Sequence, residues 1–221
     1  MDLFQIQLVG LTIAILVISL GIHEAAHGWV ALKCGDTTAR DMGRITLDPF
    51  AHIDPFMTII LPILMYMTMG VPFGGAKAVP VVFSRLRHGH RDMALVALAG
   101  PVSNVILAIG FAAIFQLTCT GSNALWGPQT LAFQVLNLAT ILNLLLAAFN
   151  MIPIPPLDGS RVMTYILPEG PIRRSYQELE RFGLLIVIVL VMFPGSPIRS
   201  FIGPAIDFLL ALIHPLVSWL G

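Results

Sequence analysis

The sequence predicts an all-α polytopic membrane protein: a bundle of about five transmembrane helices plus a re-entrant or short segment, with small β-strand elements near the cytoplasmic face. Composition is the first reason, since 57% of the 221 residues are hydrophobic and only 11% are charged, whereas soluble domains hold roughly 45–50% apolar and about 25% charged residues. The second reason is the recurrence of apolar runs long enough to cross a bilayer. We expect residues 1–221 to form a single membrane-embedded domain, with a core at about 10–165 and C-terminal helices at about 179–220.

The apolar runs predict the helices in order. Three of them reach the roughly 20 residues that a span needs: 3–32, 93–118 and 130–151. A run at 182–193 is short for a span, and a last run extends from beyond residue 197 to residue 220.

Three other segments complete the predicted fold. Residues 57–69 are too few for a span and hold Pro62, so they fit a re-entrant or interfacial segment better. Residues 44–47 and 78–83 are predicted as short strands. The second is an edge strand, because Pro80 has no N–H to donate to a neighbour.

The basic residues predict the orientation in the membrane. Of the 12 Lys and Arg residues, seven lie between Lys33 and Arg91 and four between Arg161 and Arg181. If residues 57–69 dip into the bilayer and return, these connections share one side, which the positive-inside rule makes cytoplasmic. The 12 acidic residues balance the basic ones, so nucleic acid is not an expected partner. Two cysteines are too few for a disulfide framework.

The first apolar run carries the pattern His23-Glu24-Ala25-Ala26-His27 in its last third. Residues four apart lie about 40° apart around a helix, so both imidazoles suit one tetrahedral zinc ion while Glu24 flanks them as a base. The composition predicts only about 0.003 chance matches to this pattern. Ionisable groups inside a bilayer cost about 2.5–3.5 kcal/mol each and usually mark function. We therefore prefer a zinc site to three polar side chains satisfied among packed helices.

A catalytic zinc ion needs a third protein ligand and an open position for water. Asp158 is the best placed candidate, because it follows run 130–151 across a turn stiffened by three prolines. His27 and Asp158 share one side only if the chain crosses the membrane an even number of times between them. A re-entrant segment at 57–69 meets this condition, whereas a full span there would give three crossings. Five other residues are candidates for the third ligand. We expect His52 to be a turn residue, and His88 and His90 to form a solvated cluster that faces the lipid headgroups. Asp207 and His214 stay unassigned.

Three motifs occur in order over about residues 10–165: His23-Glu24-Ala25-Ala26-His27, Ala99-Gly100-Pro101-Val102-Ser103-Asn104 and Asn150-Met151-Ile152-Pro153-Ile154-Pro155-Pro156-Leu157-Asp158-Gly159. Together they resemble the site-2 protease family of intramembrane zinc metalloproteases, in a short form without a PDZ or CBS module. The resemblance implies cleavage of a transmembrane protein substrate within the bilayer by a three-helix catalytic core. It implies one zinc ion (Zn2+) per chain held by His23, His27 and Asp158, with Glu24 as base and Asn150 assisting the oxyanion.

Alternatives stay open beside this interpretation. A membrane zinc transporter or carrier would use the same ligands without hydrolysis, although it gives no reason for Glu24. A catalytically inactive binding protein of the same fold is a third possibility. Asn104 either bonds a neighbouring helix or contributes to the site, whereas we prefer an oxyanion or substrate-carbonyl role for Asn150. We also expect residues 78–83 to hold an unwound substrate segment by edge pairing.

These interpretations place the protein in a membrane. We expect a multi-pass protein of the cell (inner) membrane, in contact with membrane lipid, whose active site opens toward the cytoplasm.

Overall fold

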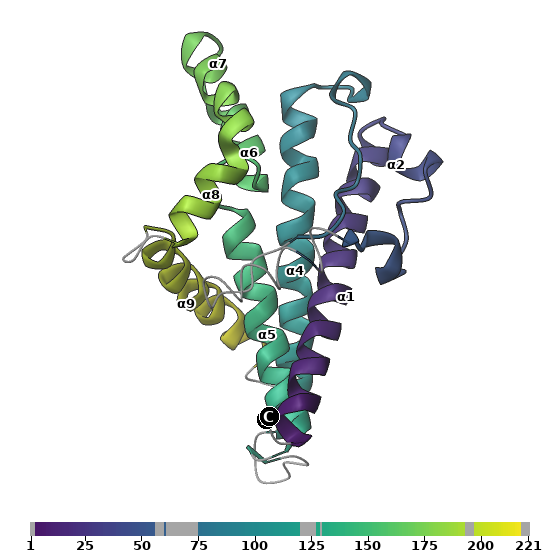
Figure 1. Cartoon of the computed structure of the whole chain (residues 1–221), viewed down its shortest axis with the longest axis vertical. Coiled ribbons are helices and arrows are strands. Elements are labelled where there is room, and N and C mark those ends of the chain that lie inside the picture. Colours follow the sequence, from purple (N-terminus) through teal and green to yellow (C-terminus); the bar gives the residue numbers. More distant parts are fainter. Residues whose placement is uncertain are drawn as a thin grey trace.

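The fold is helical, and within the residues that the computed structural model describes, 3–55, 60, 75–119, 127–128, 130–192 and 197–217, it contains no strand. With the helix labels of Figure 1, the elements in chain order are α1 Leu3–Lys33, α2 Thr38–Asp41, η1 Pro49–His52, η3 Phe83–Arg85, α4 His90–Cys119, α5 Leu131–Asn150, α6 Asp158–Ile166, α7 Pro171–Glu178, η4 Leu179–Phe182, α8 Gly183–Met192 and α9 Pro197–Val217.

Three long helices, α1, α4 and α5, lie side by side and form the body of the structure (Figure 1). Each contains a stretch long and apolar enough to cross a membrane: Gly10–Lys33, His90–Cys119 and Leu131–Asn150. Even α5, with 20 residues, extends about 30 Å at 1.5 Å per residue, which is the thickness of a bilayer core. The three long runs of the sequence are thereby confirmed as helices of span length. α4 packs against both of the others and is the central element.

The C-terminal helices are shorter or interrupted. α8 has 10 residues, too few to cross a bilayer, and the apolar stretch of α9, Ser200–Pro215, is shorter than those of the long helices. α9 packs on the long helices through Ile213, which joins Ala108 and Leu144 in a buried cluster. The described residues thus hold three helices of span length, and the count of about five stays a prediction. The re-entrant segment at 57–69 lies, apart from residue 60, outside the described residues.

The two predicted strands, 44–47 and 78–83, are wrong. No strand occurs in the described part of the chain, and both segments lie within it. In the second, the Val79 and Val82 N–H groups donate to the carboxylates of two acidic side chains at 2.8 and 2.6 Å. Pro80 has no N–H to donate. Side-chain acceptors therefore take the positions that a neighbouring strand would fill.

The polar connection after α5 folds into α6, α7 and η4. The Tyr176 hydroxyl of α7 donates to the Pro153 carbonyl at 2.8 Å, which ties α7 to the proline-rich turn before α6. An ion pair between Arg161 and Glu180 joins α6 to η4. The start of α6, where Asp158 lies, is therefore held by its surroundings as well as by its own helix.

The connections that carry most basic residues gather at one end of the bundle. The C-terminal end of α1, the N-terminal end of α4, and α6 with α7 all lie in the upper part of Figure 1. This arrangement agrees with the prediction that these connections share one side of the membrane.

Candidate metal centre

The last third of α1 presents His23 and His27 toward the neighbouring helices, one turn apart. Both are buried, with 3% and 8% of their surface exposed. Their Nε2 atoms lie 3.0 Å apart, and the Asp158 carboxylate faces both, with Oδ2 3.2 Å from His23 Nε2 and Oδ1 3.4 Å from His27 Nε2. The structure therefore brings together the three residues that the sequence predicted as metal ligands.

Asp158 reaches this position because the chain turns back sharply after α5. A Cβ atom on Gly159 would lie 2.2 Å from the Met151 carbonyl oxygen, so only glycine permits α6 to start this close to the end of α5. Asp158 is the first residue of α6. The predicted even number of crossings between His27 and Asp158 fits this contact, because an odd number would place the two residues on opposite sides.

The other ring nitrogen of each histidine has its own partner. His27 Nδ1 donates to the Val96 carbonyl oxygen at 2.7 Å, and His23 Nδ1 lies 2.6 Å from the Asn104 side-chain oxygen. Both partners are acceptors, so Nδ1 carries the proton in each ring. In the neutral imidazoles, each Nε2 then directs a lone pair toward the other histidine and toward Asp158.

These groups fit a zinc ion. Two Nε2 lone pairs and a carboxylate converge with their ligand atoms within 4.8 Å of one another, and such acceptors repel each other unless a cation lies among them. Asp158 Oδ2 is buried and accepts no hydrogen bond within the described part of the chain. A Cβ on Gly100 would lie 2.5 Å from both Nε2 atoms. The site is thus a three-ligand set of the kind that leaves one position of tetrahedral zinc open.

Glu24 is tethered next to these ligands. Its Oε2 accepts a hydrogen bond from the Val79 N–H at 2.8 Å, which fixes one carboxylate oxygen and leaves Oε1 for other partners. The sequence pattern predicted the position of Glu24 but not this contact, since a main-chain N–H has no signature in the sequence.

Asp36 holds the segment from Val79 to Val82 at its second end, just as Glu24 holds it at the first. Its side chain is fully buried and accepts hydrogen bonds from the Val82 N–H at 2.6 Å and from the Thr38 N–H at 3.0 Å and hydroxyl at 2.5 Å. Burial acts to raise the pKa of Asp36, but these hydrogen bonds, with a smaller effect of Arg85, outweigh it and hold the pKa below its usual value. No motif in the sequence points to Asp36, because it lies outside all of them.

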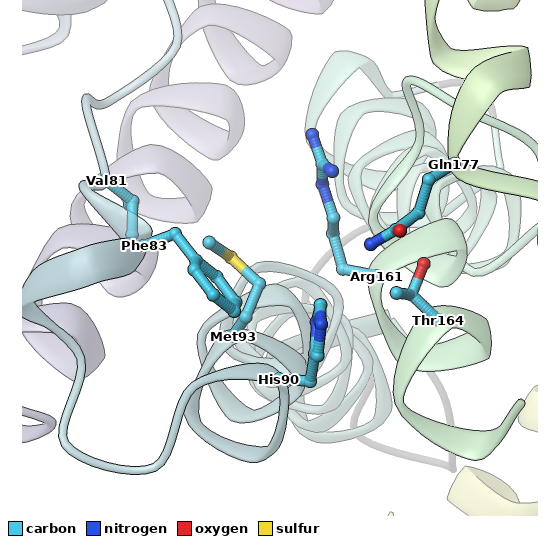
Figure 2. A pocket seen from close by; sticks show the side chains of 7 residues that line it. All are labelled: Val81, Phe83, His90, Met93, Arg161, Thr164 and Gln177. Atoms are coloured by element: carbon cyan, nitrogen blue, oxygen red, sulfur yellow. The ribbon is translucent and has the colours of Figure 1, made fainter. Parts of the chain in front are cut away.

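A cleft of about 440 Å³ lies between α4 and the pair α6 and α7, at the end of the bundle where the basic connections gather (Figure 1). Figure 2 shows its two walls facing each other, with Val81, Phe83 and Met93 on one side and Arg161, Thr164 and Gln177 on the other. His90, expected to be a solvated headgroup-facing residue, lies between the walls (Figure 2). The volume falls in the range of about 300–1,000 Å³ usual for ligand sites.

The remaining candidates do not join the three ligands. Among the described residues, the only cluster of ligating side chains is His23, His27 and Asp158. Asn150 donates from Nδ2 to the Leu146 carbonyl of its own helix at 2.9 Å. The other candidate side chains are engaged or exposed elsewhere: His52 is buried and bonds the Thr46 carbonyl, His88 pairs with Asp92, and Asp207 and His214 are exposed on α9.

Comparison with known proteins places these features in a family. Residues 123–194 match the family described as Peptidase family M50. The "Putative zinc metalloprotease YwhC" of Bacillus subtilis is 36% identical over 86% of this chain and 84% of its own length. The "Putative zinc metalloprotease Rip2" proteins of Mycolicibacterium smegmatis and Mycobacterium tuberculosis H37Rv are 30% and 33% identical, over 84% and 80% of this chain and 68% and 64% of their own lengths. None of these relatives is named as a transporter. No solved structure gives a significant match.

Proposed function

Since this chain belongs to peptidase family M50, the site-2 protease family, we propose that it is an intramembrane zinc metalloprotease that hydrolyses peptide bonds within or near transmembrane segments of membrane proteins. One observation carries the proposal: His23 and His27, which flank Glu24 on a helix long enough to span a bilayer, converge with Asp158 at the start of α6. The tethered Glu24 favours hydrolysis over transport, because a carrier needs metal ligands but no base.

The chemistry divides between the metal and the chain. A zinc ion bound by the three ligands supplies a Lewis acid that lowers the pKa of water to about 7 and polarises a carbonyl group. Glu24 takes a proton from the attacking water on Oε1, because Oε2 is held by Val79, and passes that proton to the leaving amine nitrogen. The N–H of Val79 thus keeps the carboxylate oriented while its charge changes.

Asn150 is the proposed partner for the negative charge that develops on the scissile carbonyl oxygen. Its side-chain nitrogen carries two protons, of which one goes to the Leu146 carbonyl. The second remains for a substrate oxygen. A preorganised donor of this kind stabilises an oxyanion more strongly than it stabilises the ground-state carbonyl.

A substrate helix must unwind before its amide groups become available. The segment from Val79 to Val82 is suited to hold the unwound chain, although it is not a strand. Its own conformation is fixed at both ends by carboxylates, while the Val81 N–H has no partner in the described part of the chain. A substrate in extended conformation gains a main-chain hydrogen bond there without any rearrangement of the segment.

The cleft of Figure 2 continues the site toward the basic end of the bundle. Three residues that line the cleft lie close in the sequence to residues that form or support the metal centre. Met93 lies one turn from Val96, and Arg161 one turn from Asp158. Val81, two residues from the Glu24 partner, forms part of the opposite wall (Figure 2). One helical turn rises about 5.4 Å, and we infer from this spacing that a substrate chain leaving the metal ligands continues into the cleft.

The positive-inside rule makes this end cytoplasmic, and we propose that the cleft receives the flank of the substrate on the cytoplasmic side. Its apolar wall suits an apolar side chain, and the donors of the polar wall suit peptide carbonyl groups. The protein is then a multi-pass component of the cell membrane whose site opens toward the cytoplasm.

The test is the substitution Glu24→Gln in protein reconstituted into vesicles with a single-span reporter protein that carries a helix-breaking Asn-Pro pair. We expect the wild type to cleave the reporter, and the variant to retain zinc but lose cleavage, because glutamine cannot accept the proton. Glu178→Gln, on the exposed surface of α7, is the matched control and should cleave normally. Zinc flux into the vesicles by the wild type, without cleavage, would instead establish the transporter.

A further inference from the structure

Three buried polar side chains from three different helices form one hydrogen-bonded chain behind the metal centre. Asn104 of α4 lies between His23 of α1 and Asn143 of α5. Its Oδ1 is 2.6 Å from His23 Nδ1, and its Nδ2 donates to Asn143 Oδ1 at 3.0 Å. Asn143 Nδ2 in turn donates to the Ala139 carbonyl oxygen at 2.9 Å. Both asparagines are fully buried.

The direction of this chain is fixed by its last member. A main-chain carbonyl such as that of Ala139 only accepts hydrogen bonds, so Asn143 must turn its NH2 group toward it. Asn143 Oδ1 then faces Asn104, which must donate through Nδ2. The oxygen of Asn104 consequently faces His23 and requires a proton on Nδ1. Each amide has one orientation that satisfies both of its neighbours.

We propose that Asn104 and Asn143 are positioning residues that hold His23 as the Nδ1–H tautomer, with its Nε2 lone pair directed at the metal. The inference rests on the proposed function only in that it needs the zinc site. Partners of this type commonly fix the tautomer and ring orientation of ligating histidines, and their loss costs roughly 10–100-fold in metal affinity.

The two histidines differ in how they are held. His27 Nδ1 donates to the main-chain oxygen of Val96, which no side-chain substitution removes. His23 depends on two side chains. Metal affinity is therefore sensitive to substitutions at Asn104 and Asn143, although neither residue touches the metal position.

Asn104 could act by holding His23 through the hydrogen-bonded chain, called the relay below, or only by filling space between the helices. The two roles make opposite predictions for two substitutions of Asn104. Asn104→Leu preserves the branched shape and the number of side-chain heavy atoms but removes the acceptor, so a positioning role predicts zinc affinity reduced by about 10–100-fold. Asn104→Asp gives up the donor to Asn143 but keeps an acceptor for the His23 Nδ1–H, so its zinc affinity should stay above that of Asn104→Leu. A packing role predicts the reverse order, because a buried carboxylate fits among helices worse than leucine does.

The experiment measures zinc affinity of the purified full chain in detergent, by competition with a chelator of known affinity. The absorption spectrum of the Co2+-substituted protein reports the geometry at His23, and we expect it to shift in Asn104→Leu and to stay close to the wild type in Asn104→Asp. Asn137→Leu, on the exposed surface of α5, is the matched control and should leave affinity and spectrum unchanged.

A second pair keeps the test decisive if Asn104→Leu does not fold. Asn143→Asp retains the acceptor for Asn104 and should keep the affinity, whereas Asn143→Leu removes it and should lower the affinity. Equal affinities for the Leu and Asp variants at both positions, or weaker binding by the Asp variants, would overturn the relay. No zinc binding by the wild type would instead refute the proposed function, so the two failures are distinguishable.

Discussion

Gly100 borders the space between the proposed metal ligands, and a single methyl group at this position would fill part of that space. A Cβ atom there would lie 2.5 Å from Nε2 of both His23 and His27. Ordinary van der Waals contact begins at 3.4 Å, so Gly100→Ala requires a displacement of about 0.9 Å, while metal–ligand distances tolerate changes of only about 0.2 Å. We expect zinc affinity to fall by more than the roughly 100-fold that loss of an outer partner costs.

The same substitution should not weaken the helix itself. Alanine is favoured over glycine in a helix interior by about 1 kcal/mol, so a loss of zinc in Gly100→Ala is not explained by loss of α4. Gly110→Ala is the matched control, because a Cβ at Gly110 of α4 meets nothing within 4 Å. The assay is the zinc content and chelator-competition affinity of both purified variants. Stoichiometric zinc at wild-type affinity in Gly100→Ala would refute the assignment of the site.

Two further predictions concern stability. The pKa of Asp36 is lower in the folded chain than in the unfolded one. Its contribution to stability is therefore fully present above about pH 4 and is lost as the pH falls below that value and through the folded-state pKa. Asp36→Asn should lower the unfolding free energy at pH 7 by about 1.5–3 kcal/mol and flatten this acid dependence, and equal pH profiles of the thermal midpoint for the variant and the wild type would contradict this. Gly159→Ala places a Cβ 2.2 Å from the Met151 carbonyl and should cost about 1–3 kcal/mol. Gly203→Ala, within α9 and with open space around it, should not lower the thermal midpoint, because alanine is the better helix former.

The cluster of proposed metal ligands was predictable because metal binding restricts the residue type. Two histidines one turn apart in an apolar helix and an aspartate after a proline-rich turn are costly to place in a membrane, and a shared metal ion would offset the cost of all three. The predicted positions of His23, His27 and Asp158 agree with the cluster that the structure contains. The long helices were predictable for a related reason, since a bilayer core requires about 20 apolar residues in a row and a helix that satisfies its own backbone hydrogen bonds.

The supporting contacts were not predictable, because every residue carries the groups that make them. The N–H of Val79 and the carbonyl of Val96 orient Glu24 and His27, yet any other residue at these positions offers the same atoms. The strand predicted at 78–83 failed for this reason as well. An apolar pattern indicates an extended chain, but it does not reveal that carboxylates rather than a neighbouring strand accept its hydrogen bonds.

The polar chain behind His23 suggests why fold and function share residues in this protein. Between apolar helices in lipid, hydrogen bonds between helices add to van der Waals packing in fixing how the helices are aligned. Asn104 joins α1 and α5 to α4 at one level, which is the level of the metal ligands. A shift of any of the three helices by one turn would break this chain, and a shift of α1 against α5 would also separate the histidines from Asp158, which follows α5. The residues that align the helices are therefore the ones that align the metal centre.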